Sequence, residues 1–318
     1  MILAGIDIGT NTLRLLVAET GPDSFHEICS ERRITRLGQD LDRTGMLSRD
    51  AWERSMSALL DFQDSIRKHH ALHTETIGTS ALRKASNTPE FIHDVRKRVG
   101  LEISVITGEE EARLTLLGVS AVLRGAGAKG GDDPLMSSLV IDIGGGSTEI
   151  IMTRPGMEAV MVSMPLGAVY LTERYIKHDP PTQEELAMLR RSVNDELSAH
   201  DSIIGTEPAG VFAGTAGTVT TLAAMEQGLT EYDPEKINRF ILTRDAIDGI
   251  IDILSTSTLE ERKRLPGIES GREDIILAGA VVAKEIMERY GYTKMIVSDW
   301  GLREGIIMDL HGRVSKGQ

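Results

Sequence analysis

The fold is decided by two related stretches of sequence, Ile6-Asp7-Ile8-Gly9-Thr10-Asn11-Thr12 and Ile141-Asp142-Ile143-Gly144-Gly145-Gly146-Ser147, which lie 135 residues apart. In each copy an apolar segment surrounds an aspartate, a turn with glycine follows, and an apolar pattern then resumes. This order predicts a strand, a tight turn and a second strand, which together form a β-hairpin. Two such copies about half a chain apart predict duplicated domains that face each other.

Strands and helices are expected to alternate around these hairpins, which is typical of the α/β class. Strands are predicted at residues 74–78, 103–106, 138–143, 149–152, 160–164, 210–213 and 295–298. Helices are predicted after the N-cap Ser48 and at residues 109–117, 183–198 and 274–289. The chain therefore predicts an α/β fold.

The length of 318 residues exceeds that of a usual single core, so two domains are expected. A glycine-rich tract at residues 123–134 is the natural junction between them. We therefore predict domain I at residues 1–124 and domain II at residues 125–301, with an amphipathic tail, residues 302–318, packing back on domain I.

Composition excludes several classes of protein. The formal net charge of −13 argues against nonspecific binding to a nucleic-acid polymer, which needs a broad basic surface. No apolar run approaches the roughly 18 residues that span a bilayer, and the chain begins in a strand-like segment that leaves no room for a secretory signal. The single cysteine, Cys29, cannot form an internal disulfide. These features predict a cytoplasmic protein without a membrane partner.

The turn formed by Gly144, Gly145, Gly146 and Ser147 is a candidate phosphate cradle. Glycine permits unusual dihedrals and a close approach, so successive N–H groups can point at one anion, and the serine hydroxyl adds a donor. The alternative is a hairpin that needs glycine only to turn. For Gly9, Thr10 and Asn11 taken alone the two interpretations are equally good, but the recurrence of the pattern favours phosphate binding.

Asp142 ends an apolar strand, where a carboxylate is costly unless it is paired, hydrogen-bonded or bound to a cation. Glu149 lies across the same predicted hairpin. Mg²⁺ prefers a few carboxylates together with water and substrate oxygens, so this pair suits Mg²⁺, with Mn²⁺ as the alternative ion. The other interpretation is an aspartate that accepts the N–H groups of its own turn.

A third glycine-rich element contains Gly214 and Thr215, between an apolar strand and an apolar helix. A strand, a Gly/Thr turn and a helix place free N–H groups at the helix N-terminus, which favours an anion. The element has no Gly-Lys-Ser/Thr, so it is not the phosphate loop of a P-loop NTPase.

Three consecutive glutamates, Glu109, Glu110 and Glu111, come at the start of a predicted helix. Thr107 and Glu110 fit a capping box, and carboxylates in a first turn are favoured by the helix dipole, so this cluster needs no catalytic role. Arg83 follows another Gly/Thr turn and is either a solvated helix residue or a clamp for phosphate. The residues alone leave both questions open.

Six motifs together carry a family resemblance: Asp7-Ile8-Gly9-Thr10-Asn11-Thr12, Arg36-Leu37-Gly38, Gly78-Thr79-Ser80-Ala81-Leu82-Arg83, Gly108-Glu109-Glu110-Glu111-Ala112-Arg113-Leu114, Ile141-Asp142-Ile143-Gly144-Gly145-Gly146-Ser147-Thr148-Glu149 and Leu302-Arg303-Glu304-Gly305. They resemble the exopolyphosphatase/guanosine pentaphosphate phosphohydrolase (Ppx/GppA) family in its short two-domain form. The matches run from residue 5 to residue 305, so they cover nearly the whole chain.

The resemblance implies two actin-like, ribonuclease H-like (ASKHA) domains with the active site in the cleft between them. By position it also implies a role for each motif: Glu111 and Arg83 as catalytic residues, Asn11 with Thr10 as the first-lobe turn, Gly144, Gly145, Gly146 and Ser147 as the phosphate-binding turn, and Asp142 and Glu149 as magnesium-associated acids. Thr10 and Thr12 stand where some members have serine, which preserves the hydroxyl.

These roles predict an exopolyphosphatase that releases terminal orthophosphate from inorganic polyphosphate by Mg²⁺-assisted attack of water, with Glu111 as general base. The alternative on the same site is hydrolysis of the 5′ phosphate of guanosine pentaphosphate. A more distant alternative is an actin-like small-molecule kinase, which would need an adenosine pocket and an acceptor site. The sequence does not decide the oligomeric state, and a homodimer is one state that it allows.

Overall fold

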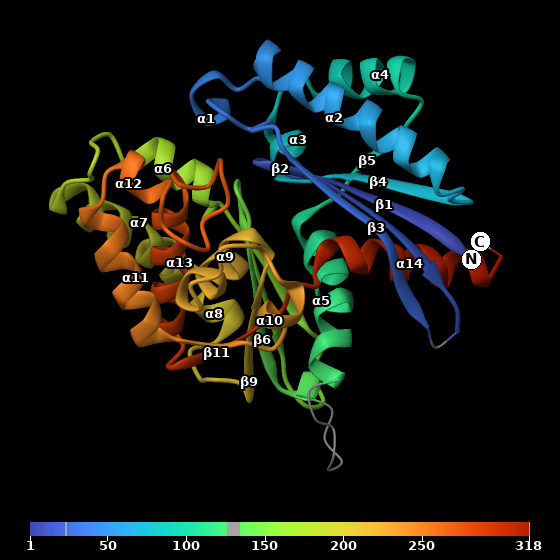
Figure 1. Ribbon diagram of the computed structural model, residues 1–318. Coiled ribbons are helices and arrows are strands. Elements are labelled where there is room, and N and C mark those ends of the chain that lie inside the picture. Colours follow the sequence, from blue (N-terminus) through green and yellow to red (C-terminus); the bar gives the residue numbers. More distant parts are fainter. Residues whose placement is uncertain (23, 126–133, 318) are drawn as a thin grey trace. The chain divides into compact units, whose positions relative to one another are not determined.

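Two mixed β-sheets organise the chain, one in each of two units (Figure 1). The computed structural model describes residues 1–22, 24–125 and 134–317. Unit 1 comprises Met1–Gly118 and Gly301–Gln318, and unit 2 comprises Val119–Trp300. The first unit thus ends six residues before the predicted boundary at residue 124, and the tail after Gly301 belongs to it. Most of the predicted glycine-rich junction lies outside the described residues.

The sheet of unit 1 has the order β3-β2-β1-β4-β5. Its strands are β1 (Ile2–Ile8), β2 (Thr12–Thr20), β3 (Phe25–Ile34), β4 (His73–Gly78) and β5 (Ile103–Val105). The first three form an antiparallel meander, and β4 and β5 run parallel to β1. The hairpin predicted around the stretch from Ile6 to Thr12 is thus the β1–β2 hairpin.

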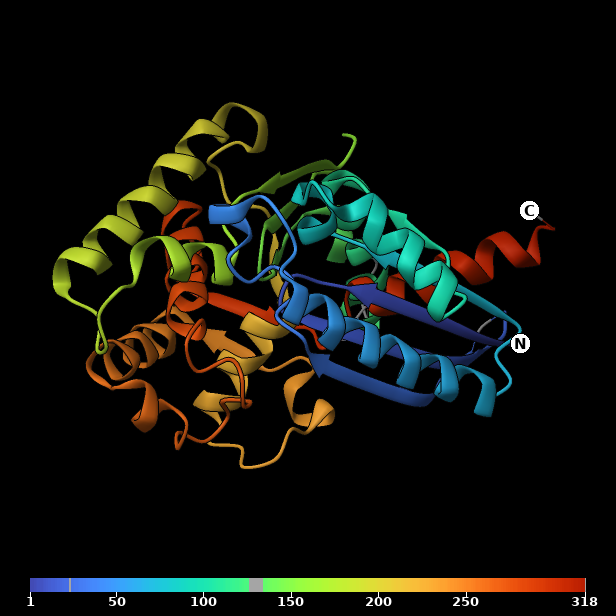
Figure 2. The ribbon, with the colours of Figure 1, turned by 90° about the horizontal axis from the view of Figure 1, so that it is seen from above.

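The two faces of this sheet are covered by different helices. The described helices of unit 1 are α1 (Leu41–Thr44), α2 (Arg49–Lys68), α3 (Ser80–Lys84), α4 (Thr88–Arg98), the first part of α5 (Gly108–Gly125) and α14 (Leu302–Ser315). Helices α2 and α4 lie over one face, as Figure 2 shows, and α14 crosses the other. Ser48 caps α2 as predicted, because its hydroxyl accepts the N–H of Ala51.

Alternation along β1 explains how both faces become buried. Ala4, Ile6 and Ile8 join the cluster under α2, whereas Leu3 packs with Ile307 of α14. Successive side chains of a strand point to opposite faces, so a strand covered on both sides must be apolar throughout.

The sheet of unit 2 has the order β10-β11-β9-β6-β7-β8. Its strands are β6 (Ser138–Ile143), β7 (Thr148–Thr153), β8 (Val160–Met164), β9 (Val211–Thr215), β10 (Ile241–Thr243) and β11 (Lys294–Val297). The part β8-β7-β6-β9-β11 repeats the order and the strand directions of β3-β2-β1-β4-β5. This repetition confirms the duplication predicted from the two hairpin stretches.

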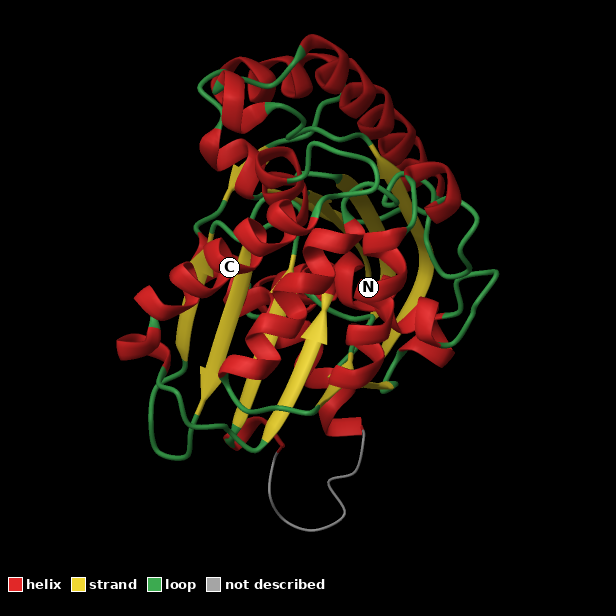
Figure 3. Cartoon of the chain, turned by 90° about the vertical axis from the view of Figure 1, so that its left-hand side faces the viewer, coloured by secondary structure: helices red, strands yellow, loops and turns green. Residues whose placement is uncertain are grey.

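Most helices of unit 2 lie between β8 and β11 in the chain. Figure 3 shows helices in red packed against strands in yellow. The helices of unit 2 are the end of α5, the short η1 (Pro134–Met136), α6 (Ala168–Tyr175), α7 (Gln183–Ala199), α8 (Asp201–Ile204), α9 (Ala216–Glu226), α10 (Pro234–Ile237), α11 (Arg244–Thr256), α12 (Leu259–Arg262) and α13 (Ile276–Arg289). Helices α9 and α13 are buried along most of their lengths because they form the centre of the core of this unit. The predicted α/β class is confirmed.

Candidate active site

An ion pair between Arg83 and Glu111 lies in unit 1. Arg83 Nη1 is 2.6 Å from Glu111 Oε2, and the same nitrogen donates to the carbonyl of Ile106 at 3.1 Å. The side chain of Glu111 is only 10% exposed and that of Arg83 is 22% exposed. The structure therefore brings the two predicted catalytic residues together, and it places a carboxylate in a largely dry environment beside a cation.

The position of Arg83 is fixed by the end of β4. Both the N–H and the hydroxyl of Thr79 donate to the carbonyl of Ile8, at 3.2 and 3.3 Å, which ties the start of α3 to the end of β1. A side chain at Gly78 would meet Leu82, so glycine allows α3 to fold back against its own strand. Arg83 is therefore held near the β1–β2 turn.

The three consecutive glutamates at the start of α5 have different surroundings. Glu109 is exposed, and hydrogen bonds from its own backbone N–H and from Thr107 lower its pKa. Glu110 pairs with Arg113, so the capping box predicted for Thr107 and Glu110 is only half present: Thr107 accepts the N–H of Glu110, but the carboxylate of Glu110 is engaged elsewhere. Glu111 is the buried member of the cluster.

The β1–β2 turn holds the predicted residues Thr10 and Asn11. Gly9 donates its N–H to the carbonyl of Thr12 at 3.2 Å and closes the turn. The carbonyl of Thr10 accepts the N–H of Gly38, and the carbonyl of Asn11 accepts two N–H groups of the segment 35–36. Within the described ranges, the N–H groups of Thr10 and Asn11 have no acceptor. Both residues are buried, and the turn is therefore able to receive an anion.

The β6–β7 turn repeats this geometry in unit 2. Gly144 donates its N–H to the carbonyl of Ser147 at 3.0 Å, and the carbonyls of Gly144 and Gly145 accept N–H groups from the first turn of α6 at 2.8 to 3.2 Å. In the part of the chain that the structure describes, the N–H groups of Gly145 and Ser147 find no acceptor. A side chain at Gly167 would collide with the backbone of Gly145 and Gly146, so this glycine lets α6 support the turn.

Asp142 and Glu149 are direct cross-strand partners on β6 and β7. Such partners lie on the same face of the sheet, with Cβ atoms about 5 Å apart. Both are buried, at 7% and 1% exposure, and Glu149 Oε1 accepts the hydroxyl of Ser163 at 2.7 Å. Asp142 is also paired with Thr215 on β9, so the two acids and these two hydroxyl residues form one row across four strands.

This row bears on the predicted metal. Residues 1–22, 24–125 and 134–317 contain no group of three or more His, Cys, Asp or Glu side chains suited to a metal ion. Two carboxylates nevertheless fit Mg²⁺, which takes one or two carboxylates and completes its shell with water and substrate oxygens. The donor set is therefore compatible with Mg²⁺ and not with an all-protein cage.

The β9–α9 turn contains the other two predicted phosphate-binding residues. A side chain at Gly214 would collide with Met295 and Val219, so this glycine is needed for close packing inside unit 2. The hydroxyl of Thr215 donates to the carbonyl of Trp300 at 3.0 Å. These contacts account for both residues without a ligand, and their predicted role in phosphate binding stays a prediction.

Two features of this turn were not predicted from the sequence. Ala216 has a φ of 67°, which is uncommon for a residue other than glycine. The guanidinium of Arg272 lies so close to Gly217, in the first turn of α9, that any side chain there would collide with it. Arg272 is 7% exposed and pairs with Glu269 at 3.2 Å. No sequence pattern near Arg272 indicates that its side chain reaches α9, because the contact joins segments 55 residues apart.

Comparison with known proteins identifies this arrangement. The model of the Ppx/GppA phosphatase family matches residues 16–314. The chain belongs to the Ppx/GppA phosphatase family. The resemblance inferred from the six motifs is thereby confirmed, and membership makes the protein a phosphoanhydride hydrolase with an actin-like α/β fold.

Relatives of this Ppx/GppA protein match over nearly their full lengths. It is 35% identical to exopolyphosphatase 2 of Mycobacterium tuberculosis, with 98% of each chain covered. Its structure is similar to that of the Aquifex aeolicus family member, with a TM-score of 0.81, 34% identity and 98% of each chain covered. It is also similar to an exopolyphosphatase from Cytophaga hutchinsonii, with a TM-score of 0.87, 27% identity and coverage of 98% and 97%.

Among the described residues, no helix has the length and apolar character needed to cross a membrane. The cleft expected between the two domains, and the individual roles of the site residues, stay predictions.

Proposed function

We propose that this Ppx/GppA protein is an exopolyphosphatase that removes terminal orthophosphate from inorganic polyphosphate, with Glu111 as general base. The observation that carries the proposal is the buried carboxylate of Glu111, held 2.6 Å from the guanidinium of Arg83 in the first turn of α5. The near-full-length similarity to exopolyphosphatase 2 of M. tuberculosis favours polyphosphate as the substrate.

Glu111 would orient the attacking water and accept its proton. The neighbouring guanidinium and the N-terminal end of α5 both favour a charged carboxylate, which is the form that a base needs. A carboxylate has about four lone-pair sites, so an ion pair on Oε2 leaves capacity to accept a hydrogen bond from water. Arg83 has five N–H donors, which suits it to hold Glu111 and a phosphate oxygen at once.

The glycine turns would stabilise the charge of the phosphoryl group. Phosphoryl transfer spreads charge over the equatorial oxygens, and preorganised N–H donors stabilise that charge. The N–H groups of Gly145 and Ser147 in unit 2, and those of Thr10 and Asn11 in unit 1, are the donors we assign to this task. The carbonyls of Thr10, Asn11 and Gly145 accept N–H groups of neighbouring segments, and that of Ser147 accepts the N–H of Gly144, so both turns are restrained.

Asp142 and Glu149 would hold Mg²⁺ from one face of the β6–β7 hairpin. When bound, the ion would neutralise substrate oxygens and stabilise the leaving phosphate. The buried position of both acids on one face of the hairpin supports this assignment, because a cation offsets the repulsion between two neighbouring carboxylates.

The decisive experiment is Glu111→Gln, with Glu109→Gln as the matched control on the same helical turn. We expect kcat for phosphate release from polyphosphate to fall by about 100-fold or more in Glu111→Gln, since a general base contributes that much. Glu109→Gln should stay within about threefold, because Glu109 is exposed. Retention of activity within about tenfold by Glu111→Gln would remove Glu111 from the role of base.

A substrate panel separates the alternatives. Phosphate release is measured from polyphosphate, from guanosine pentaphosphate and from ATP, each with and without Mg²⁺. A higher kcat/KM for guanosine pentaphosphate than for polyphosphate would favour the nucleotide hydrolase on the same site. Release of phosphate without any acceptor would exclude the small-molecule kinase.

A further inference from the structure

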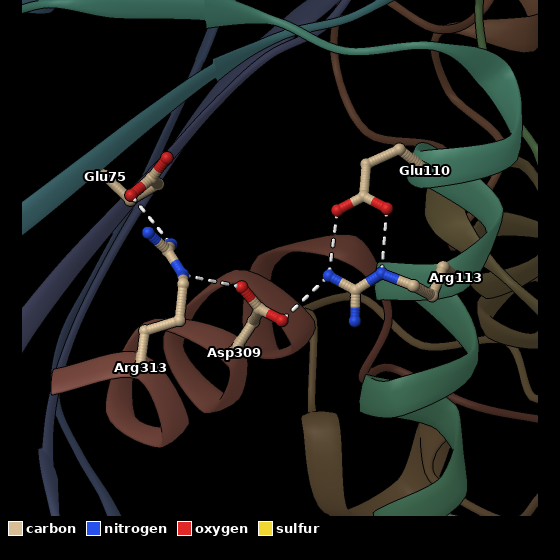
Figure 4. Close-up of polar contacts among 5 residues, drawn as sticks. All are labelled: Glu75, Glu110, Arg113, Asp309 and Arg313. Atoms are coloured by element: carbon tan, nitrogen blue, oxygen red, sulfur yellow. Dashed lines mark hydrogen bonds and ion pairs between the residues drawn. The ribbon is translucent and has the colours of Figure 1, made fainter. Parts of the chain in front are cut away.

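A chain of ion pairs joins three elements of unit 1, as Figure 4 shows; its members are Glu75, Arg313, Asp309, Arg113 and Glu110. Arg313 lies 2.9 Å from Glu75 Oε2 and 3.0 Å from Asp309 Oδ2. Arg113 donates to Asp309 Oδ1 at 2.7 Å and to both oxygens of Glu110 at 2.8 Å. The ion-pair chain thus links β4 to α14 and α14 to the start of α5.

Two members of the ion-pair chain lie on either side of the candidate base in the sequence of α5. Glu110 and Arg113 belong to the chain, and Glu111 lies between them. Each residue of an α-helix is turned by about 100° from the one before, so Arg113 points about 200° away from Glu111. The contact of Arg113 with α14 is therefore on the opposite side of α5 from Glu111.

The ion-pair chain borders a pocket in the surface of unit 1. A cavity of about 290 Å³ is lined there by Ile77, Ile106, Leu114 and Ile306, together with the five members of the chain. The pocket is open to solvent, because Arg113 and Arg313 at its edge are 42% and 44% exposed. Behind the pocket, Leu114 of α5 packs with Leu302 and Ile306 of α14 in a buried apolar cluster, so the charged contacts lie on the solvent side of an apolar contact between the two helices.

Further along, the two helices touch through glycine. A side chain at Gly305 of α14 would collide with the carbonyl of Leu114, and one at Gly118 of α5 would collide with the backbone of Gly301. This backbone contact restrains the distance between the helices. The pair Arg113–Asp309 adds a polar contact between the same two helices, one residue nearer the start of α5.

Stability alone is a poor reason for this ion-pair chain. The side chains of Arg113 and Arg313 are 42% and 44% exposed and those of Asp309 and Glu75 are 23% and 22% exposed, so solvent screening limits what these pairs contribute to folding. The geometry of the ion-pair chain, in contrast, affects the positions of both Arg83 and Glu111. Arg83 follows β4, which Glu75 anchors, and Glu111 lies on α5, which Arg113 anchors.

We propose that Arg113 is a positioning residue for Glu111. Its ion pair with Asp309 of α14 fixes the rotation of the first turn of α5 and so orients the carboxylate of Glu111 towards the attacking water. This inference rests on the proposed function of Glu111 as general base. The C-terminal helix α14 is thereby part of the catalytic apparatus, although it contributes no group to the chemistry.

The test is Arg113→Met, which keeps a long apolar stem and removes the guanidinium. A misplaced catalytic group is costly, so we expect kcat on polyphosphate to fall by about 10- to 100-fold with KM within about twofold. The matched control is Arg98→Met, because Arg98 also joins two helices through two carboxylates, Glu53 and Asp94, and is 38% exposed. Arg98→Met should keep kcat within about twofold and show a similar shift in thermal unfolding.

Coupling to Glu111 distinguishes positioning from a general structural effect. In the Glu111→Gln background, Arg113→Met should cause no further loss, since residues that act as a unit are not additive. Asp309→Asn should reproduce the loss of Arg113→Met, and the double variant should be no worse than either. Arg113→Lys retains the charge but not the bidentate geometry of the guanidinium, so its kcat should lie between those of Arg113→Met and the parent.

Three outcomes would overturn the inference: kcat of Arg113→Met within about twofold of the parent, a rise in KM at unchanged kcat, or an equal fold-loss in the Glu111→Gln background. These outcomes are separable from failure of the proposed function. If Glu111→Gln itself retains activity, the assignment of the base fails; if Glu111→Gln is inactive and Arg113→Met is not, only the positioning role fails.

Discussion

Replacing glycine by alanine in the two equivalent turns, Gly9→Ala and Gly144→Ala, tests whether turn geometry governs catalysis. A Cβ added to Gly9 would lie 2.8 Å from the carbonyl oxygen of Thr12, and one added to Gly144 would lie 3.2 Å from that of Ser147. Neither glycine has a positive φ, so alanine causes no dihedral strain and the clash alone is measured.

The expected loss follows from the space available. Ordinary contact needs about 3.4 Å, so the β1–β2 turn must widen by about 0.6 Å and the β6–β7 turn by about 0.2 Å. If a displacement of 1 Å costs about 100-fold in rate and the logarithm of the rate scales with distance, Gly9→Ala should lose about 15-fold in kcat/KM and Gly144→Ala about 2- to 3-fold.

The assay is initial-rate release of phosphate from polyphosphate over a range of substrate concentrations, with thermal unfolding measured for each variant. Gly249→Ala is the control, because nothing lies within 4 Å of an added Cβ and the residue is inside α11. It should keep full activity and gain slightly in stability. A larger loss for Gly144→Ala than for Gly9→Ala, at equal thermal stability, would refute the reasoning.

Two further predictions concern the metal and acid stability. Asp142→Asn should raise the Mg²⁺ concentration for half-maximal phosphate release by about 10-fold or more, measured by titration of the metal-free enzyme, because one of two carboxylate ligands loses its charge; an unchanged Mg²⁺ requirement would contradict the assignment. Burial would raise the pKa of Glu185, but hydrogen bonds from two backbone N–H groups and from His178 lower the pKa from 4.5 to about 2. Because the folded pKa is depressed, this stabilisation is present above about pH 4.5 and is lost as the pH falls towards 2. Between pH 5 and pH 2 the free energy of unfolding should therefore fall by on the order of 2 kcal/mol more in the parent than in Glu185→Gln, measured by denaturant titration; parallel pH profiles would contradict it.

Much of the fold was predictable because its signals are local. A glycine turn between two apolar segments specifies a hairpin through backbone dihedrals and side-chain alternation, so both hairpins were found at the correct residues. The capping box at Thr107 and Glu110 failed in part for the opposite reason. The carboxylate of Glu110 had a competing partner, Arg113, which the capping pattern does not take into account.

The candidate site was predictable only in pieces. From residue chemistry alone, any of the three consecutive glutamates could be helix-capping or catalytic, and only the family motif selected Glu111. The structure separates them physically, because Glu111 is buried against Arg83 while Glu109 faces solvent. Arg272, which packs against the first turn of α9, was missed, since no short-range pattern marks a contact across 55 residues.

The duplicated hairpins, the glycine turns and the α/β alternation are therefore properties of neighbouring residues, and they can be deduced from the chain without coordinates. Partner choice is different. Arg113 meets Asp309 across 196 residues, and Arg83 meets Glu111 only because α3 and α5 are brought together by the sheet of unit 1. A side chain's partner depends on which distant segments share a face, and that is decided when the strands pair and the helices pack over them.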